Sequence, residues 1–196
     1  MQDCSLTATD LSCRRGERLL FRGLSLALAA GEAVQVAGAN GVGKSSLIRI
    51  LAGLSAPFSG RVTQAGALGL IDERTALDPG LPLGKALAFW AGIDRLEGQA
   101  REPITDRLGL TNLLDVPVRY LSTGQKKRAA FARLQGQQVP VWLLDEPLNG
   151  LDRDGAALVE ALAADHCAAG GICVIASHQP FALPAMRQLD LASFAP

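Results

Sequence analysis

The sequence predicts an α/β fold with a mostly parallel sheet. Three apolar runs, "EAVQVAG", "VWLLD" and "GGICVIAS", lack the polar alternation of half-exposed strands and indicate strands buried on both faces. After the first run, Leu47, Ile50, Leu51 and Leu54 recur at the spacing of one helix face. A second helix is expected at about 155–168, closed by two glycines just before the third run. Buried strands alternating with helices indicate a parallel sheet covered by helices.

Length and composition limit the classes of protein that remain. The 196 residues suit one domain, and 48% apolar content indicates a globular chain. Lys+Arg and Asp+Glu are both 19, so there is no overall basic field to attract nucleic acid. Apolar runs fall short of the roughly 20 residues that span a bilayer, and "MQDCSLTATD" lacks the features of an export signal. The four cysteines form no C-x-x-C pair, which suits reduced thiols in a cytoplasm.

The stretch "GANGVGKSSL" lies between the first strand and the helix after it. It matches G-x-x-x-x-G-K-[ST] through Gly38, Gly43, Lys44 and Ser45. Glycines let backbone N–H groups close around a phosphate, the lysine reaches the outer phosphates, and the serine hydroxyl can ligate Mg²⁺. A glycine-rich turn met by chance is the alternative, but the strand-to-helix context favours a phosphate loop. The predicted nucleotide contacts here are Asn40, Gly41, Gly43, Lys44, Ser45 and Ser46.

Two adjacent acids follow the second apolar run, in "VWLLDEPLNGLD". Asp145 ends the strand at the edge where parallel α/β sheets bind ligands, so its carboxylate can hold Mg²⁺. Glu146, one residue later, is placed to take a proton from a water that attacks the terminal phosphate. An ordinary strand end with two solvated acids is the alternative. The phosphate loop in the same chain favours the catalytic interpretation.

A third motif, "LSTGQKKRAAFARL", indicates the start of a helix. Ser122 and Gln125 have the spacing of a capping box. Free N–H groups of the first turn, the bare backbone at Gly124 and the Ser122 hydroxyl can bind an anion. The cations at 126–128 oppose the helix dipole, and a nearby polyphosphate would relieve that conflict. The alternative is a capped surface helix with a solvated basic face.

His178 follows the third apolar run, in "GGICVIASHQP". Its strand points to the same sheet edge as Asp145, so we expect this side chain to contact the γ-phosphate. A zinc cluster of His166, Cys167, Cys173 and His178 is a rival interpretation. Their spacing matches no standard zinc pattern, and Cys173 is expected in the core, which disfavours it.

The order of these stretches resembles one protein family. "GANGVGKSS", "LSTGQ", "WLLDEP", "LNGLD" and "SHQP" are similar to the Walker A, signature, Walker B, D-loop and H-loop of an ABC-type ATPase. The resemblance implies one domain, 1–196, that binds ATP and Mg²⁺. It would have a RecA-like core (about 1–71 and 137–196), a small antiparallel β part and a helical subdomain (about 72–136). It also implies a sandwich homodimer in which Ser122, Gly124 and Gln125 of one subunit contact the ATP held by Lys44 of the other.

Within that superfamily, the chain resembles the ATP-binding subunit of the haem exporter of bacterial cytochrome c maturation. The shared features are the short length, "GEAVQVAGANGVGKSSLIRILAGL", "LPLGKALAFW" and "SHQP". The resemblance implies integral-membrane partners, a peripheral position on the cytoplasmic face of the inner membrane, and ATP hydrolysis linked to haem delivery. It implies that haem is not bound by this chain. The alternatives are export of another substrate, a soluble ABC ATPase acting on DNA or ribosomes, and a small-molecule kinase.

Two departures from the family leave two roles open. Residues 1–20 contain no aromatic side chain to stack on adenine, and Arg15 takes the matching place, where a guanidinium can stack instead. No glutamine lies between Gln64 and Gln99, where the family has a metal-sensing one. Glu73 would then act as a Mg²⁺ ligand, or it is a solvated loop acid.

One surface of the helical subdomain is a candidate for the membrane partner. The segment "GLPLGKALAFWAGI" would receive a cytoplasmic helix of that partner. The alternative places Leu83, Leu87 and Trp90 in the protein's own core, which their helical spacing favours.

Overall fold

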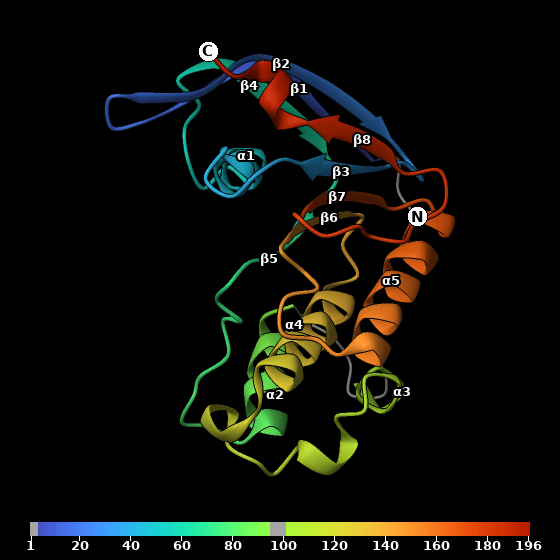
Figure 1. Cartoon of the computed structure of the whole chain (residues 1–196). Helices are drawn as coiled ribbons and strands as arrows, with labels where there is room; N and C mark the ends of the chain where they lie inside the picture. Colours follow the sequence, from blue (N-terminus) through green and yellow to red (C-terminus); the bar gives the residue numbers. More distant parts are fainter. Residues whose placement is uncertain (1–3, 95–100) are drawn as a thin grey trace.

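The computed structural model describes residues 4–94 and 101–196, with two sheets and a group of helices (Figure 1). The strands are β1 (Ser5–Arg15), β2 (Arg18–Ala29), β3 (Ala33–Ala37), β4 (Ser59–Ala65), β5 (Leu68–Ile71), β6 (Val141–Asp145), β7 (Ile172–Ala176) and β8 (Arg187–Asp190). The α-helices are α1 (Lys44–Leu51), α2 (Leu83–Ile93), α3 (Arg101–Arg107), α4 (Thr123–Gln137) and α5 (Arg153–Ala168). Short 3₁₀ turns are η2 (Thr111–Leu113), η3 (Val118–Tyr120) and η4 (Leu191–Phe194).

A five-stranded parallel sheet carries the predicted motifs. Its strand order is β5-β6-β7-β3-β8. The three apolar runs of the sequence form β3, β6 and β7, which are neighbours, with Ala176 opposite both Asp145 and Val36. Because parallel neighbours end at the same edge, the segments that follow these three strands meet there.

Both faces of this sheet are buried, as the unbroken apolar strands predict. Along β6, Val141 and Leu143 pack with α1 and the antiparallel strands, while Trp142 and Leu144 pack with α2, α4 and α5. Alternate side chains therefore serve two separate cores. The expected α/β class with a mostly parallel sheet is confirmed.

A three-stranded antiparallel sheet of order β2-β1-β4 covers α1. Figure 1 shows this sheet at the top, α1 between the two sheets, and the other helices on the opposite side of the parallel sheet. This is the small antiparallel part that the family resemblance implies. Between β5 and β6 the described chain is helical or irregular, which fits the expected helical subdomain.

Helix α4 begins at the predicted cap, whereas α5 begins earlier than expected. Ser122 accepts the Gln125 N–H at 3.2 Å, and Gln125 Oε1 accepts the Ser122 N–H at 2.8 Å, so the capping box is present. Helix α5 starts at Arg153, two residues before the expected start, because Asp152 accepts the Gly155 N–H at 2.8 Å.

One expectation about an apolar residue is corrected, and one alternative interpretation is confirmed. Leu54 does not continue α1, because the helix ends at Leu51 and Gly53 turns the chain with φ +70°, which leaves Leu54 57% exposed. On α2, Leu83 and Leu87 are core residues, as the alternative interpretation held. The exposed apolar side chains of α2 are Phe89 and Ile93.

Of the four residues of the rival zinc interpretation, Cys167 and Cys173 hydrogen-bond through their side chains, whereas the two histidines have other partners. His166 Nε2 is 3.1 Å from the Pro140 carbonyl oxygen, and its ring stacks on Trp142. His178 instead contacts Glu146 at the carboxyl edge of the sheet. Within residues 4–94 and 101–196, no group of three or more His, Cys, Asp and Glu side chains could hold a metal ion.

Candidate active site

The loop between β3 and α1 leaves backbone donors free. Gly43 is the N-cap of α1, has φ +117°, and makes no side-chain cap bond to the first turn. A Cβ at this position would lie 3.2 Å from the Phe21 ring and in a backbone region that other residues avoid. The glycine therefore allows the chain to enter the helix with its N–H groups unblocked. Such a helix N-terminus is suited to an anion, and the residues here fit a nucleotide phosphate.

Lys44 is held inside this loop. Its side chain is 6% exposed, and Nζ donates to the carbonyl oxygens of Gly38 at 2.8 Å and Ala39 at 3.3 Å. Its ammonium also lies 3.8 Å from Glu146 Oε1. The loop thus has a fixed positive charge beside the free N–H groups, which adds to its attraction for a phosphate.

Ser45 and Asp145 form a pair of oxygen donors. The Ser45 hydroxyl donates to Asp145 Oδ1 at 3.0 Å, joining α1 to the end of β6. Burial raises the pKa of Asp145; the Ser45 bond lowers it, and the nearby carboxylates of Glu146, Glu73 and Asp72 raise it. A hard divalent cation prefers such oxygen ligands and would relieve the repulsion among these acids. The donor set therefore fits Mg²⁺.

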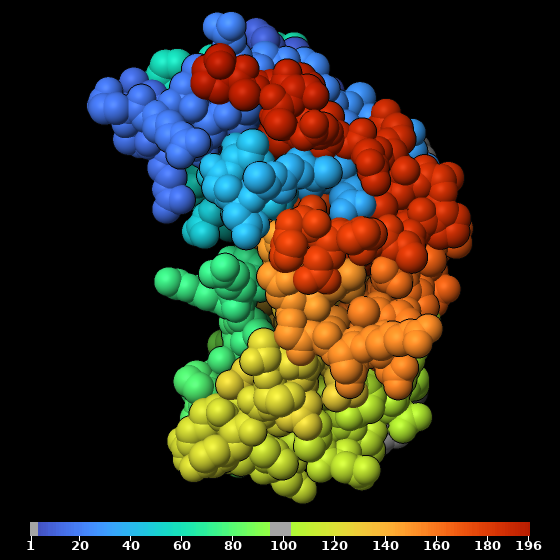
Figure 2. All heavy atoms as spheres, viewed as in Figure 1, coloured from blue at the N-terminus to red at the C-terminus, as the bar shows by residue number. Residues whose placement is uncertain are grey.

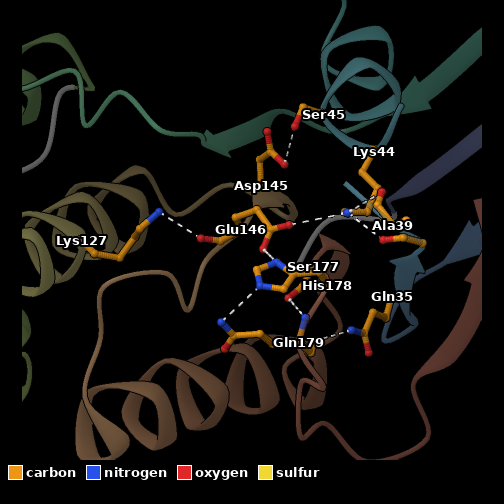
Figure 3. Close-up of polar contacts among 11 residues, drawn as sticks. Gln35, Ala39, Lys44, Ser45, Lys127, Asp145, Glu146, Ser177, His178 and Gln179 are labelled. Carbon is orange, nitrogen blue, oxygen red and sulfur yellow. Dashed lines mark hydrogen bonds and ion pairs between the residues drawn. The ribbon is translucent and has the colours of Figure 1, made fainter. Parts of the chain in front are cut away.

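Glu146 is held between a lysine and a histidine (Figure 3). One carboxylate oxygen faces Lys44, and Oε2 is 2.9 Å from His178 Nδ1. Its backbone has φ +46°, and its N–H donates to the Ala176 carbonyl at 2.8 Å. A carboxylate fixed in this way at a ligand edge can accept a proton from a bound water.

The turn that carries His178 is anchored from β3. The buried Gln35 donates through Nε2 to the Gln179 carbonyl at 2.7 Å, and the Gln179 N–H donates to Ser177 Oγ at 3.0 Å. Figure 3 shows this chain of contacts running from Gln35 to His178 and Glu146. Sequence reasoning missed Gln35, although an amide inside an otherwise apolar strand was a signal for a buried polar role.

The predicted loop residues, Glu146 and His178 line one cavity of about 570 Å³. Arg15 and Glu73, the two less typical assignments, also line it. Sequence reasoning missed three further lining residues, Arg18, Leu20 and Asn149. Arg18 lies opposite Arg15 in the β1–β2 hairpin, and the sequence alone did not reveal this register. The full lining is Arg15, Arg18, Leu20, Asn40, Gly41, Gly43, Lys44, Ser45, Ser46, Glu73, Glu146, Asn149 and His178.

A second hollow of about 700 Å³ adjoins the first and shares Arg15, Ser45, Ser46 and Glu73 with it. Asp145 lines this second hollow. Figure 2 shows the molecule hollowed between α1 and the segment that follows β5. Glu73 therefore lines both hollows together with Ser45, and the second one together with Asp145.

The signature residues Ser122, Gly124 and Gln125 do not line either hollow in the same chain. The three cations after them each find a main-chain carbonyl. Lys126 Nζ donates to Arg119 O at 3.4 Å, Lys127 Nζ to Glu146 O at 3.2 Å, and Arg128 Nη1 to Leu108 O at 3.0 Å. Acceptors within the chain thus offset the unfavourable helix dipole, where the sequence suggested a polyphosphate.

Comparison with known proteins adds the family. The model of the ABC transporter family matches residues 21–149. A Novosphingobium aromaticivorans protein, "Cytochrome c biogenesis ATP-binding export protein CcmA", is 59% identical and covers 100% of both chains. A Sphingopyxis alaskensis protein of the same description is 48% identical over 97% of this chain and 98% of its own. The chain belongs to the CcmA family of ABC transporter ATPases.

Solved structures of ABC transporter subunits share the fold. An ATP-binding subunit of an ABC transporter superposes with a TM-score of 0.80 at 23% identity, covering 88% of this chain and 79% of that one. CbiO1 from Clostridium perfringens, part of the ABC transporter complex cbiONQ, gives 0.74 at 26% identity, covering 91% and 80%. The first likeness concerns the fold alone. Together with the family match, they show that the chain is an ABC ATPase, which hydrolyses ATP.

Proposed function

We propose that this ABC ATPase drives haem export and delivery for cytochrome c biogenesis. The supporting observation is similarity over the full length to relatives whose names place them in cytochrome c biogenesis export. The phosphate loop, the acid pair and the histidine of the site are adjacent in the folded chain, which supports ATP hydrolysis at this site. Haem itself is handled by the partner subunits and does not bind this chain.

In the proposed site, Glu146 is the general base and His178 contacts the γ-phosphate. Glu146 already has one oxygen near Lys44 and the other near His178, so its carboxylate is oriented before substrate binds. Lys44, Ser46 and the loop N–H groups hold the phosphates. Ser45 and Asp145 would hold Mg²⁺, which when bound neutralises charge on the phosphates.

Two assignments complete the nucleotide site. Arg15 stacks on the adenine in place of an aromatic side chain, because it lines the same cavity as the phosphate loop. Glu73 acts as an additional Mg²⁺ ligand, because it lines both hollows beside Ser45.

The working unit is a homodimer. Ser122 and Gln125 cap α4 through reciprocal hydrogen bonds, and Gly124 leaves the backbone of the first turn bare. All three residues lie outside the two hollows of their own chain. In the dimer, this turn of each subunit contacts the ATP held by Lys44 of the other subunit.

The dimer works at the cytoplasmic face of the inner membrane beneath integral-membrane subunits. None of the helices within residues 4–94 and 101–196 has the length and apolar character needed to cross a bilayer. A partner helix docks on the helical subdomain, at a hollow of about 460 Å³ whose lining includes Ala76, Leu81, Phe89 and Trp90. Phe89 is 60% exposed there and offers an apolar contact.

Deletion of the gene tests the proposed cargo. We expect covalent haem attachment to c-type cytochromes to be lost in the deletion strain and restored by the parent gene, but not by a gene that encodes Glu146→Gln. Haem-stained gels of periplasmic and membrane fractions provide the measurement. Unchanged cytochromes would leave the ATPase in place and remove haem as the cargo.

Co-purification separates the remaining alternatives. A membrane protein recovered with the tagged chain supports the transporter subunit. Export of another substrate would then be indicated if the cytochromes of the deletion strain were normal. Ribosomes or DNA recovered instead would indicate a soluble ABC ATPase. The neutral composition of the chain argues against that outcome.

A further inference from the structure

Lys127 is a buried charge that has no role in the site proposed above. It lies on α4, five residues after Ser122, and its side chain is 8% exposed. Its Nζ donates to the main-chain carbonyl of Glu146 at 3.2 Å, as Figure 3 shows. A lysine is rarely buried to this extent unless its ammonium has a specific partner. Here the partner is the backbone of the proposed general base.

The backbone of Glu146 is in an unusual conformation. Its φ of +46° is in the left-handed region, which costs free energy for a residue with a side chain. Two contacts hold it there: the N–H donates to Ala176 of β7, and the carbonyl accepts from Lys127 of α4. The first contact belongs to the sheet, and the second comes from the helical part of the molecule. The orientation of the Glu146 carboxylate therefore depends on both parts.

The surroundings of Lys127 are acidic. The charged groups that act on it are Asp145, Asp72, Glu146 and Glu73, which come from the ends of β5 and β6. Burial lowers the pKa of Lys127, and these four carboxylates raise it. The ammonium is thus near the acids of the proposed hydrolysis site and offsets part of their mutual repulsion.

Stability alone gives little reason for a lysine at this position. An apolar side chain of similar length often replaces a buried charge without loss of stability. An apolar side chain, however, could not donate to the Glu146 carbonyl.

We propose that Lys127 is a positioning residue for ATP hydrolysis, which holds the Glu146 carbonyl so that the Glu146 carboxylate stays aimed at Lys44 and His178. The inference rests on the proposed role of Glu146 as the base. Since α4 begins with the signature residues, the same bond links the signature to the base within one chain. A displacement of α4 from β6 would break this bond, so hydrolysis is sensitive to the position of α4.

Substitutions at two neighbouring lysines test this. We expect Lys127→Met to lower the single-turnover rate of ATP hydrolysis by the full chain about tenfold or more, since a hydrogen bond to a charged donor is lost. The Kd for ATP should stay within about twofold, because no phosphate contact changes. Lys127→Arg, which keeps a donor, should recover most of the rate. Lys126→Met is the matched control, because that lysine bonds to Arg119, and it should keep the parent rate.

A double variant shows whether Lys127 acts through Glu146. In the Glu146→Gln background, Lys127→Met should cause no further loss of rate. The proposal is overturned if Lys127→Met hydrolyses ATP at the parent rate, or if it lowers the rate equally in the parent and Glu146→Gln backgrounds. It is also overturned if Lys127→Arg binds ATP normally yet is as slow as Lys127→Met. Thermal unfolding shows whether each variant is folded in the assay. If the Met variant is unfolded, the rate of the Arg variant tests the proposal instead. If Glu146→Gln alone hydrolyses ATP at the parent rate, the proposed base itself fails, and this result is separate from any effect at residue 127.

Discussion

A single residue connects most of the site. Glu146 meets Lys44 from the phosphate loop, His178 from the end of β7, and Lys127 from α4 through its carbonyl. Three separate segments therefore fix the side chain and backbone of one residue before any substrate is bound. Such preorganisation would let the proposed proton acceptor react without further ordering.

Replacing this carboxylate separates hydrolysis from binding. We expect Glu146→Gln to slow ATP hydrolysis by about 10²- to 10⁴-fold, because the amide cannot act as a base. ATP binding should be retained, since the phosphate loop is unchanged, whereas Lys44→Ala should weaken binding itself. Single-turnover rates and equilibrium binding of ATP provide the check. A parent rate for the glutamine variant in the assembled complex would place the base elsewhere.

The carboxylate of Glu73 gives a prediction about metal dependence. It lines both hollows beside Ser45, so Glu73→Gln should keep much of the activity and change the Mg²⁺ concentration needed for half-maximal rate, while Glu73→Ala should lose activity. Hydrolysis is measured across a Mg²⁺ titration. If both variants follow the parent curve, Glu73 is a solvated loop acid, which was the alternative interpretation of the sequence.

At the scale of elements, the end of α5 is joined to β6 by a ring stack. The His166 ring lies 4.0 Å from the Trp142 ring, nearly parallel to it, and His166 Nε2 is within hydrogen-bond distance of the Pro140 carbonyl. A Cβ on Gly171 would lie 2.2 Å from His166 Nε2, so the glycine pair after α5 also makes room for this ring. The sequence predicted the glycines as helix stops and not as ring contacts.

Acid should weaken this contact between α5 and β6. Burial lowers the pKa of His166 below its usual 6.5, so the unfolded chain binds a proton more readily than the folded one. The neutral His166 ring contributes its full share of stability above pH 6.5, and this share is lost as the pH falls below that value. We expect the free energy of unfolding, measured in urea between pH 7.5 and 5.5, to fall less steeply in His166→Phe than in the parent. Equal slopes for the two proteins would show that His166 does not contribute.

How far the sequence predicts the molecule depends on the range of the contacts. Strands β3, β6 and β7 and the cap at Ser122 follow from local patterns of burial and hydrogen bonding, and all four are present. The loss of Leu54 from α1 was not visible, because helical spacing continues past the point where Gly53 turns the chain.

Contacts between distant segments were the least predictable part of the site. Nothing in the order of residues states that Gln35 would hold the turn after His178, or that Lys127 would reach Glu146. Each depends on how the strands are ordered and how α4 packs. The position of Arg18 at the cavity was likewise not predictable, because it depends on the register of the β1–β2 hairpin.

At the scale of the whole molecule, one chain forms only part of the proposed working site. The phosphate loop lines a cavity, while the signature turn at Ser122 is exposed and lies outside it. A second copy would supply the missing donors.

ATP should therefore control association. We expect the isolated chain to be a monomer with weak hydrolysis, and Glu146→Gln, which retains its ATP, to form a dimer with two bound nucleotides. Sedimentation velocity with and without ATP measures this. Ser122→Ala in the same background is expected to weaken the dimer. A monomer at every concentration, also with the membrane partner present, would contradict the sandwich arrangement.

The order of strands also bears on how the chain matures during synthesis. Strand β3, which leads into the phosphate loop, has β7 and β8 as its neighbours, and both come from residues 172–190. During synthesis on a ribosome, β3 therefore stays without its partners β7 and β8 until nearly all the residues described here have emerged. Pairings this distant along the chain form slowly. The nucleotide pocket should accordingly be among the last features to appear in a nascent chain, after the β1–β2 hairpin.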